Sequence, residues 1–215
     1  MAIYPTKLLM LSETLILVTL SKLKSPIQDL GSFRLPTNFR ERSDGYVQLW
    51  WLVQSTLFGM SPQFLYGWRR FLLRLFGASI GTAVLIRPSV RITFPWKVCI
   101  GNNSWIGDDV VLYSLGAITI GSNAVISQKS YLCTGSHDIG SPHFDIQAQT
   151  ITVQDEAWVA TDVFIAPGVT IGQGAVVGAR SSVFKDIPPL VVAVGNPAVV
   201  VRARGVSQEQ RSCIS

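Results

Sequence analysis

The stretch IGNNSWIGDDVVLYSLGAITIGSNAVISQKSYL, residues 100–132, carries an aliphatic side chain at every sixth position. Ile100, Ile106 and Leu112 form one run of three, and a second run begins at Ile120, twenty residues after the first. The six-residue period extends to both sides of this stretch. Its other members are Ile80, Ile86, Ile92, Ile126, Leu132, Val153, Val159, Ile165, Ile171, Val177 and Val183. The chain after residue 79 therefore contains an internal repeat.

A six-residue period fits neither an amphipathic helix nor a long alternating strand. It fits a solenoid in which three short flat faces make one coil of about eighteen residues, with one aliphatic side chain per face pointing to the axis. Glycines such as Gly101 and Gly121 suit the corners, where a permissive backbone is useful. A β-sandwich with evenly spaced strands is the alternative. The expected fold class is mainly β, a parallel β-helix of hexapeptide repeats with an N-terminal helical segment.

The repeat divides the 215 residues into three parts. Residues 1–79 form a basic, aromatic-rich segment with two expected helices, residues 80–204 form the β-helix, and residues 205–215 form a C-terminal tail. The period breaks after the third run, which predicts a projecting loop at 138–152. Residues 1–97 hold twelve Lys and Arg against four Asp and Glu, whereas the rest of the chain holds six against nine. This asymmetry predicts an anionic surface or ligand as a partner of the N-terminal part.

The N-terminal segment contains an uncharged stretch, residues 45–68, that is long enough to span a membrane. Polar residues interrupt it, and Ser61 followed by Pro62 predicts the end of one helix and the start of another, with Ser as N-cap. We therefore expect two helices and no span. Residues 8–20 resemble a signal peptide, but Glu13 lies inside the run and no small-residue cleavage pattern follows. The expected location is the cytoplasm.

The second expected helix, residues 62–76, is amphipathic. Its apolar residues recur at helical spacing, and Arg69, Arg70 and Arg74 lie off that stripe. One interpretation buries the apolar stripe against the rest of the protein. The other lays residues 46–76 on an anionic membrane surface, which gives a peripheral contact with the inner face of the cytoplasmic membrane.

Cysteine and histidine are scarce in the sequence. Cys99, Cys133 and Cys213 have no metal-ligand spacing, and their odd number argues against a disulfide framework. Reduced thiols are typical of a cytoplasmic protein. The two histidines, His137 and His143, are too few for a three-histidine zinc site within one chain. No metal is expected.

Two stretches of the chain resemble a known family. WVATDVFIAPGVTIGQGAVVGARSSVFKDIPP and VGNPAVVVR, within residues 158–202, are closely similar to the C-terminal signature of hexapeptide-repeat acyltransferases. The basic N-terminal segment together with YLCTGSHDI, residues 131–139, most resembles the exopolysaccharide O-acetyltransferases of the colanic-acid type. The resemblance covers residues 80–204 and implies a left-handed β-helix, against the general preference for right-handed crossovers. It also implies acetyl-CoA as co-substrate, a homotrimer with active sites between subunits, and a sugar or lipid-linked oligosaccharide as acceptor, with no nucleic-acid partner.

Transfer of an acetyl group from a thioester to a hydroxyl needs a base for the hydroxyl proton. An imidazole suits this task at neutral pH, and His137 lies where the repeat is interrupted. In the resembling family the histidine at this place is the catalytic base, so His137 receives that role and His143 is interpreted as a loop residue. Asp138 is a candidate to orient the imidazole, with a backbone carbonyl or another carboxylate as alternatives. Cys133 suggests an acetyl-cysteine intermediate, but the resemblance implies direct transfer.

Polar and aromatic residues one coil before the catalytic histidine suit a sugar. Sugar hydroxyls need hydrogen bonds, and the apolar faces of a sugar need a platform. The candidate acceptor-binding residues are Trp105, Asp108, Tyr113 and Ser114. In sugar-acetylating relatives this coil supplies an Asn, and the matching position here is Gly107, so the acceptor contacts are expected to differ.

The carrier site is expected along the coils. Thr161 and Ala179 are eighteen residues apart, so they stack on one face and leave a groove beside the coils. In related enzymes the matching positions contact the pantetheine arm of coenzyme A, and Lys185 and Arg202 match basic residues near its phosphates. Trp158, at the start of a coil, is either a wall of the groove or a subunit contact. These five residues are the candidate cofactor-binding residues.

The sequence therefore predicts an acetyl-CoA-dependent O-acyltransferase that acetylates a sugar hydroxyl in exopolysaccharide biosynthesis. Two alternatives are an acetyltransferase of a small acceptor, such as serine or a free sugar, and a non-enzymatic β-helical scaffold at the membrane. A γ-type carbonic anhydrase shares the β-helix, but the missing histidines disfavour it.

Overall fold

The computed structural model describes residues 26–205. They belong to two units, of which one contains residues 26–36 with His137–Ile146 and the other contains residues 37–136 with 147–205. The apolar run at 8–20, Cys213 and nearly all of the predicted tail lie outside the described residues.

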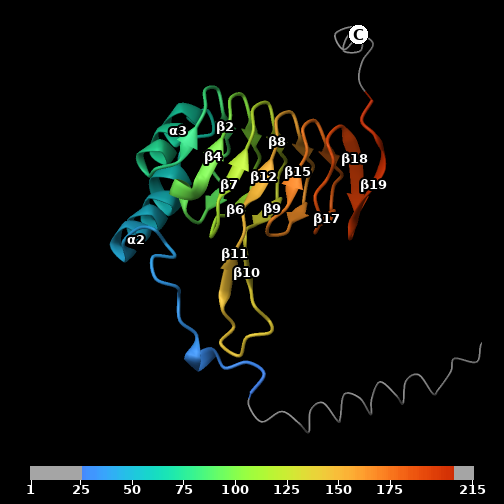
Figure 1. Cartoon of the computed structure of the whole chain (residues 1–215). Helices are drawn as coiled ribbons and strands as arrows, with labels where there is room; N and C mark the ends of the chain where they lie inside the picture. The colour runs from blue at the N-terminus through green and yellow to red at the C-terminus, as the bar shows by residue number, and fades with distance from the viewer. Residues whose placement is uncertain (1–25, 206–215) are drawn as a thin grey trace, which may run out of the picture. The chain divides into compact units, whose positions relative to one another are not determined.

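Most of the larger unit consists of short strands in three sheets, here called A, B and C, which the chain visits in turn to complete each coil (Figure 1). All strands of the coils pair in parallel except β19. Sheet A contains β1 (Ser79–Ile80), β4 (Val98–Ile100), β7 (Ile118–Ile120), β12 (Ile151–Val153) and β15 (Thr170–Ile171). Sheet B contains β2 (Leu85–Ile86), β5 (Trp105–Ile106), β8 (Val125–Ile126), β13 (Trp158–Val159), β16 (Val176–Val177), β18 (Val191–Gly195) and β19 (Ala198–Ala203). Sheet C contains β3 (Arg91–Ile92), β6 (Val111–Tyr113), β9 (Tyr131–Cys133), β14 (Phe164–Ile165) and β17 (Ser182–Val183).

The strand register follows the sequence repeat. Ile80 pairs with Ile100 across a twenty-residue coil, and Val153 pairs with Ile171 across an eighteen-residue coil. Every aliphatic member of the predicted repeat is at most 7% exposed, so these side chains form the core of the coils. The predicted β-helix of hexapeptide repeats is confirmed.

The expected role of the glycines is wrong. Gly101 and Gly121 have ordinary φ values, and the left-handed backbone at the corners belongs to other residues, including Asn103, Asp109 and Asn123. The glycines are required for a different reason, the close approach of the next coil. A Cβ atom on Gly121 would lie 2.6 Å from the backbone nitrogen of Asp155, closer than real Cβ contacts allow.

The N-terminal part of the larger unit is helical, as predicted, with different boundaries. It contains α2 (Asp44–Val53), continued by the π-helical η2 (Gln54–Phe58), then α3 (Tyr66–Leu75), and later the short 3₁₀ turn η3 (Pro95–Lys97). Ser61 does not cap the second helix, because its hydroxyl donates to the Phe58 carbonyl oxygen and accepts from the Arg69 guanidinium. The helix therefore begins four residues after Pro62.

The interpretation in which the second helix buries its apolar stripe holds only in part. Leu72 and Phe76 are buried, whereas Phe71 and Leu75 are more than half exposed, and Arg69 is fully buried. The guanidinium of Arg69 donates to the Ile86 carbonyl oxygen at 2.6 Å, and that of Arg74 donates to the Ile80 carbonyl oxygen at 2.7 Å. The arginines of α3 thus point to the first coil.

These carbonyl groups are the ones that the first coil leaves without a partner. In the second coil, the carbonyl oxygens of Ile100, Ser104, Ile106 and Leu112 each accept from a backbone N–H of the first coil. The equivalent oxygens of the first coil accept from side chains of the helices: Arg74 on Ile80, Arg70 on Val84, Arg69 on Ile86 and Trp50 on Ile92. The helical segment is therefore a cap on the open edge of the β-helix.

The other end of the β-helix is closed by a hairpin, in which β19 pairs antiparallel with β18. Arg204 follows this hairpin and donates to the carbonyl oxygens of Glu156 and Gly174, at 3.0 and 2.8 Å. Within residues 26–205, no helix has the length and apolar character needed to cross a membrane.

The smaller unit contains the 3₁₀ turn η1 (Leu30–Ser32) and the turn between β10 (Gly135–His137) and β11 (Ile146–Ala148). The two strands form a separate two-stranded sheet. The predicted loop at 138–152 is therefore shorter, because residues 146–148 return as a strand and the coils resume at Ile151.

Candidate active site

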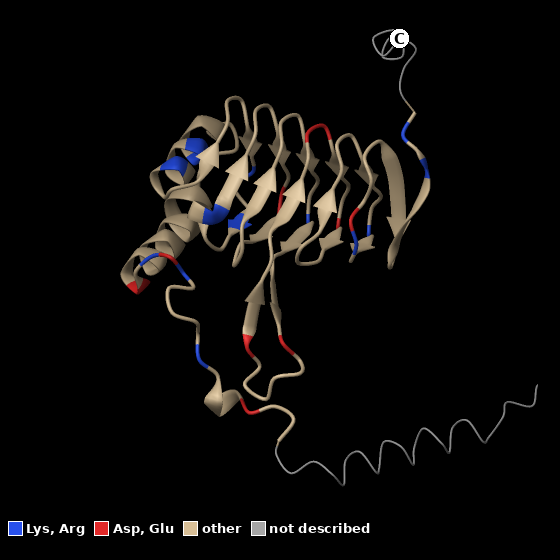
Figure 2. Cartoon of the chain, in the orientation of Figure 1, with Lys and Arg blue, Asp and Glu red and all other residues tan. Residues whose placement is uncertain are grey.

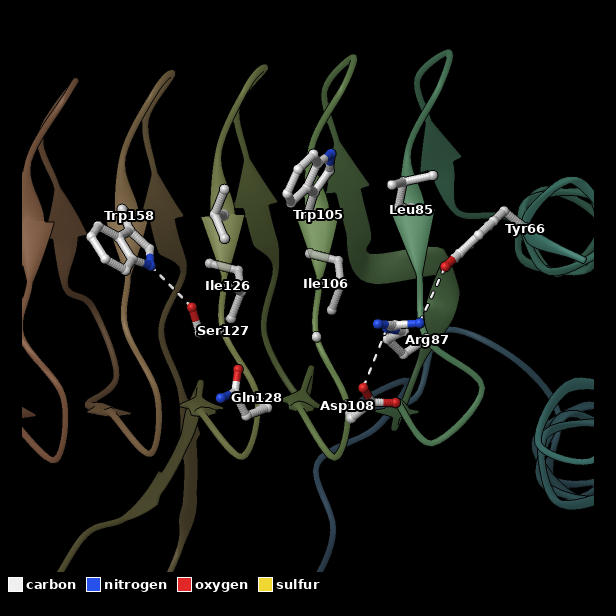
Figure 3. Close-up of a pocket in the computed structure, with 12 residues that line it drawn as sticks. Tyr66, Leu85, Arg87, Trp105, Ile106, Asp108, Ile126, Ser127, Gln128 and Trp158 are labelled. Carbon is white, nitrogen blue, oxygen red and sulfur yellow. Dashed lines mark hydrogen bonds and ion pairs between the residues drawn. The ribbon is translucent and has the colours of Figure 1, made fainter. Parts of the chain in front are cut away.

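A groove crosses the outer surface of sheet B (Figure 3). The strand register aligns Leu85, Trp105, Val125 and Trp158 in one row. Trp105 and Trp158 are about half exposed, at 55% and 46%, and the smaller Val125 between them leaves a hollow. The cavity has a volume of about 550 Å³, which is within the range of small-molecule sites.

Polar groups line the lower edge of the groove (Figure 3). Arg87 forms an ion pair with Asp108, with 3.3 Å between Nε and Oδ2, and donates to the Tyr66 hydroxyl at 3.2 Å. The indole N–H of Trp158 donates to the Ser127 hydroxyl at 3.0 Å. Two flat indoles above a row of donors and acceptors suit a ligand with both apolar and hydroxyl-bearing faces.

Sequence reasoning identified both indoles and Asp108 but missed Tyr66, Arg87, Ser127 and Gln128, which also line the groove. Ser127 and Gln128 had a signal. They lie twenty residues after Gly107 and Asp108, so the coil spacing places them one level along the same face. Tyr66 had none, because it comes from the helical cap.

The predicted acceptor-binding set is divided between faces of the β-helix. Trp105 and Asp108 line the groove on sheet B, whereas Tyr113 belongs to sheet C and lines a separate hollow of about 440 Å³ with Trp51 and Arg91. Burial, with a smaller contribution from Cys133, raises the pKa of the Tyr113 hydroxyl, so it stays protonated at neutral pH.

The structure contradicts the acceptor role of Ser114. Its side chain is fully buried, and its hydroxyl accepts from the Phe94 backbone N–H at 2.8 Å and donates to the Phe94 carbonyl oxygen at 3.0 Å. The fold uses this hydroxyl to join two successive coils. At Gly107 a Cβ atom would lie 2.7 Å from the Gln128 backbone nitrogen, which explains why the coil carries no Asn there.

The predicted cofactor-binding residues do not all line one surface. Trp158 lies in the groove, next to the acceptor candidates. Thr161 lies at the following corner, where its hydroxyl donates to the Gln128 carbonyl oxygen. The carbonyl oxygen of Thr161 accepts from the backbone N–H of Arg180, one coil later. The bond to Arg180 agrees with the predicted stacking of Thr161 and Ala179, because Arg180 follows Ala179 directly.

Lys185 and Arg202 are exposed, and within residues 26–205 neither forms an ion pair with a carboxylate. Among residues 26–205, Arg202 donates only to the neighbouring Ala203 carbonyl oxygen, at 3.2 Å. Both cations are thus free to meet an anionic ligand. Neither lines the groove on sheet B.

The smaller unit fixes the imidazole of His137. Its Nδ1 lies 2.7 Å from the Phe144 carbonyl oxygen, and its ring stacks on the Phe144 ring at a centroid distance of 4.0 Å and an angle of 8°. Phe33 packs at a tilt, 6.2 Å away. A carbonyl oxygen only accepts, so Nδ1 carries the hydrogen and Nε2 is left with a free lone pair.

Asp138 does not orient this imidazole, which contradicts its predicted catalytic role. Its carboxylate accepts from the Gly140 backbone N–H at 2.9 Å and so stabilises the turn. The group that meets the imidazole in the structure is a backbone carbonyl, which was one of the alternatives. His143 bonds through Nδ1 to the Ser32 hydroxyl at 2.8 Å, in agreement with a loop residue.

Cys133 has the wrong environment for a nucleophile. Burial raises the pKa of its thiol, and a backbone hydrogen bond with Gly135 lowers it by a smaller amount. The thiol is therefore protonated at neutral pH. Among the described residues, no three His, Cys, Asp or Glu side chains gather as metal ligands.

Comparison with known proteins gives close relatives. The chain is 64% identical over 178 residues to the protein named colanic acid biosynthesis acetyltransferase WcaF of Escherichia coli strain K12, which covers 83% of this chain and 98% of that protein. No family model matches the chain.

Two solved structures share the fold. One is a hexapeptide-repeat acetyltransferase of Vibrio cholerae O1 biovar eltor complexed with acetyl coenzyme A, with a TM-score of 0.69 and 25% identity over 76% of this chain and 89% of that chain. The other is a galactoside acetyltransferase in complex with coenzyme A, with a TM-score of 0.69 and 26% identity over 79% of this chain and 84% of that chain.

The relatives confirm the expected enzyme class and remove the alternative of a non-enzymatic scaffold. The family assignment rests on three findings that agree. They are the six-residue repeat, the coils that it forms and the identity to WcaF over nearly the whole length of that protein. The chain belongs to the hexapeptide-repeat acetyltransferases.

Proposed function

We propose that the chain transfers an acetyl group from acetyl-CoA to a sugar hydroxyl during exopolysaccharide biosynthesis, with His137 as the general base. The observation that carries the proposal is the hydrogen bond from His137 Nδ1 to the Phe144 carbonyl oxygen. It fixes the tautomer in which Nε2 accepts a proton. The 64% identity to a protein named for colanic acid biosynthesis supports an exopolysaccharide acceptor.

The proposed reaction is direct. Nε2 of His137 takes the proton of the sugar hydroxyl while the hydroxyl oxygen forms a bond to the thioester carbonyl carbon. The carbon–sulfur bond then breaks, and the sulfur of CoA leaves with the proton from the imidazolium. The imidazole returns to its starting state, and no covalent enzyme intermediate forms. The protonated thiol of Cys133 supports this route over an acetyl-cysteine.

In this proposal the groove on sheet B holds the reacting ends of both substrates. Trp105 and Asp108 contact the sugar, and Trp158 lines the path of the acetyl group. Thr161 and Ala179 border the pantetheine arm, and Lys185 and Arg202 meet the CoA phosphates. Two structural neighbours hold acetyl-CoA or CoA, which supports a carrier site on this fold.

We also propose that the enzyme is a homotrimer with its active sites between subunits. In this proposal a neighbouring subunit, which carries its own His137, closes the groove on sheet B. The sugar is proposed to be part of a polymer or a lipid-linked unit. The enzyme would work in the cytoplasm, at the inner face of the membrane, with residues 46–76 in contact with the lipid.

The first test replaces the base. His137→Ala is expected to lower acetyl transfer to the exopolysaccharide acceptor by about 10³-fold or more, because general base catalysis and the orientation of the hydroxyl are both lost. Binding of CoA, measured by calorimetry, is expected to persist. The matched control is Cys133→Ala, which leaves transfer within about twofold on the direct route. Equal rates for wild type and His137→Ala would overturn the mechanism.

Mixed trimers test the position of the site. Co-expression of His137→Ala with Trp158→Ala, each inactive alone, is expected to restore about a quarter of the wild-type activity, because random pairing joins intact halves in that share of interfaces. A site contained within one subunit would give no recovery.

The choice of acceptor is tested in the same assay. Serine and free sugars are expected to react poorly as acceptors. Preferential use of either would replace the polymer or lipid-linked unit in the proposal.

A further inference from the structure

The helical cap exposes a continuous set of large apolar side chains, here called the apolar helix face. Its members are between 37% and 80% exposed. They are Leu57, Met60, Phe64, Leu65, Trp68, Phe71 and Leu75. Monomeric soluble proteins rarely expose apolar side chains in such a contiguous group without a binding role.

Five members of the apolar helix face are neighbours in space, and the other two, Phe64 and Leu75, lie four residues before Trp68 and four residues after Phe71. Leu57, Met60, Leu65 and Trp68 line one hollow of about 380 Å³ between η2 and α3. The indole N–H of Trp68 donates to the Leu57 carbonyl oxygen at 2.9 Å, and its ring stacks on that of Phe71 at 5.7 Å. The hollow and the stripe of α3 are therefore one surface.

The exposure of this surface is built into the fold. The opposite side of α3 buries Arg69, Leu72 and Leu73, and Arg70 and Arg74 are held by carbonyl oxygens of the first coil. Rotation of α3 to bury Phe71 would break every one of these arginine bonds. The apolar helix face therefore stays outward as long as the cap is intact.

Charge favours one occupant for this face. Residues 37–97 hold eight Lys and Arg against two Asp and Glu, whereas residues 98–205 hold five against eight. Figure 2 shows lysine and arginine gathered on and around the helices. Hydrogen bonds to neutral carbonyl oxygens leave the charges of Arg70 and Arg74 uncancelled, and among the described residues neither lies within ion-pair distance of a carboxylate.

A second copy of the same face would bring two positively charged surfaces together, which is unfavourable. An anionic bilayer offers negative headgroups for the cationic surroundings and acyl chains for the apolar side chains.

We propose that the apolar helix face inserts into an anionic bilayer, with Phe64, Trp68 and Phe71 among the acyl chains, while the arginines of α3 remain bound to the first coil. This inference deepens the membrane contact in the proposed function and rests on it. The direct contact with lipid is then made by apolar side chains. The net positive charge of the N-terminal part attracts the protein to the anionic surface, and Arg69 does not bind a headgroup.

The test measures partitioning of the full chain onto vesicles of phosphatidylglycerol and phosphatidylethanolamine by flotation. The double variant Phe64→Ser, Phe71→Ser is expected to lower the partition coefficient by roughly 10- to 100-fold. The matched control is Val199→Ser, Val200→Ser, which removes two comparably exposed apolar side chains from β19. This control is expected to bind like wild type. Equal binding of wild type and the Phe64, Phe71 variant would overturn the inference.

Three further readouts keep the outcomes distinct. Acetyl transfer to a soluble acceptor is expected to be unchanged in the Phe64, Phe71 variant, so failure of the catalytic proposal would appear separately from failure of membrane binding. Sedimentation is expected to give the same oligomer for both proteins, and a smaller oligomer for the variant would instead identify the face as a subunit contact. Vesicles of phosphatidylcholine alone are expected to bind more weakly, and equal binding would contradict the role of charge.

Discussion

The first and last coils of the β-helix both lack a neighbouring coil on one side, and the chain covers them with different chemistry. At the first coil, side chains of α2 and α3 cover the edge, with the indole of Trp50 and three guanidinium groups as donors. At the last coil, strand β19 covers β18 by backbone pairing. One end therefore depends on side chains and the other on a hairpin.

The elements next to each end explain this difference. Successive coils bond in both directions, as in the bonds from the Gly81 N–H to the Ile100 carbonyl oxygen and from the Asn103 N–H to the Thr82 carbonyl oxygen. The first coil therefore leaves carbonyl groups unpaired and also the N–H of Ile92, which donates to a side chain of η2. The backbone groups of a helix are already paired within the helix, so the helical segment reaches the first coil with side chains. A strand has free backbone groups, so β19 pairs directly with β18.

Basic residues of the N-terminal part have a structural role. Three of its arginines donate hydrogen bonds to carbonyl oxygens of the first coil, so their presence alone does not indicate an anionic ligand. The net charge still acts at a distance, as the membrane inference requires.

The largest effect is expected from the most buried donor of the cap. Arg69→Met keeps the length of the side chain but leaves the carbonyl oxygens of Ile86, Pro62 and Gln63 without their donor. We expect the free energy of unfolding to fall by about 2–4 kcal/mol, measured by urea denaturation. Arg69→Lys is expected to recover only part of the loss, because an ammonium cannot reproduce the planar fork. Wild-type stability for Arg69→Met would mean that water satisfies the edge without the cap.

The coils show how far the sequence alone predicts the fold. The aliphatic period identified one buried residue per strand of the coils from Ile80 to Val183, because a buried position that recurs on every face leaves a direct record in the sequence. Other core residues, such as Val84 and Ile118, lie outside that period. The orientation of α3 was not predictable in the same way. Periodicity separates the apolar stripe from the arginines, but the partner of each side depends on unpaired carbonyl groups that exist only once the first coil has formed.

In the candidate site, too, some residues could be predicted from the sequence, and others depend on contacts that exist only in the folded chain. Trp105 was predicted as a platform for a sugar, and Trp158 as a wall of the carrier groove or a subunit contact. The strand register brings both to one groove, which was not predicted. Asp138 was predicted to orient the imidazole of His137 but bonds to the turn, because adjacency in sequence gives no direction to a side chain there. Phe144 carried no signal, since the carbonyl group that meets His137 belongs to every residue type.

A smaller effect is expected from the indole of the cap. Trp50→Phe removes the N–H that donates to the Ile92 carbonyl oxygen and also some buried volume. The expected loss is about 1–2 kcal/mol in the free energy of unfolding. The adjacent Trp51 is 41% exposed and provides the control. Trp51→Phe is expected to change stability by less than about 0.5 kcal/mol, and equal losses for both variants would show that ring volume and not the hydrogen bond stabilises the edge.

The smallest effect is expected at the last coil, where a side chain only supplements the backbone hairpin. Arg204 is partly exposed, and water can replace its bonds to the carbonyl oxygens of Glu156 and Gly174. Arg204→Met is therefore expected to lower the free energy of unfolding by about 0.5–1 kcal/mol. Arg202→Met is the control, since that side chain donates only to its neighbour Ala203, and no change in stability is expected. If Arg204→Met destabilised the protein as much as Arg69→Met, both ends would depend on side chains, and the hairpin would not be what covers the last coil.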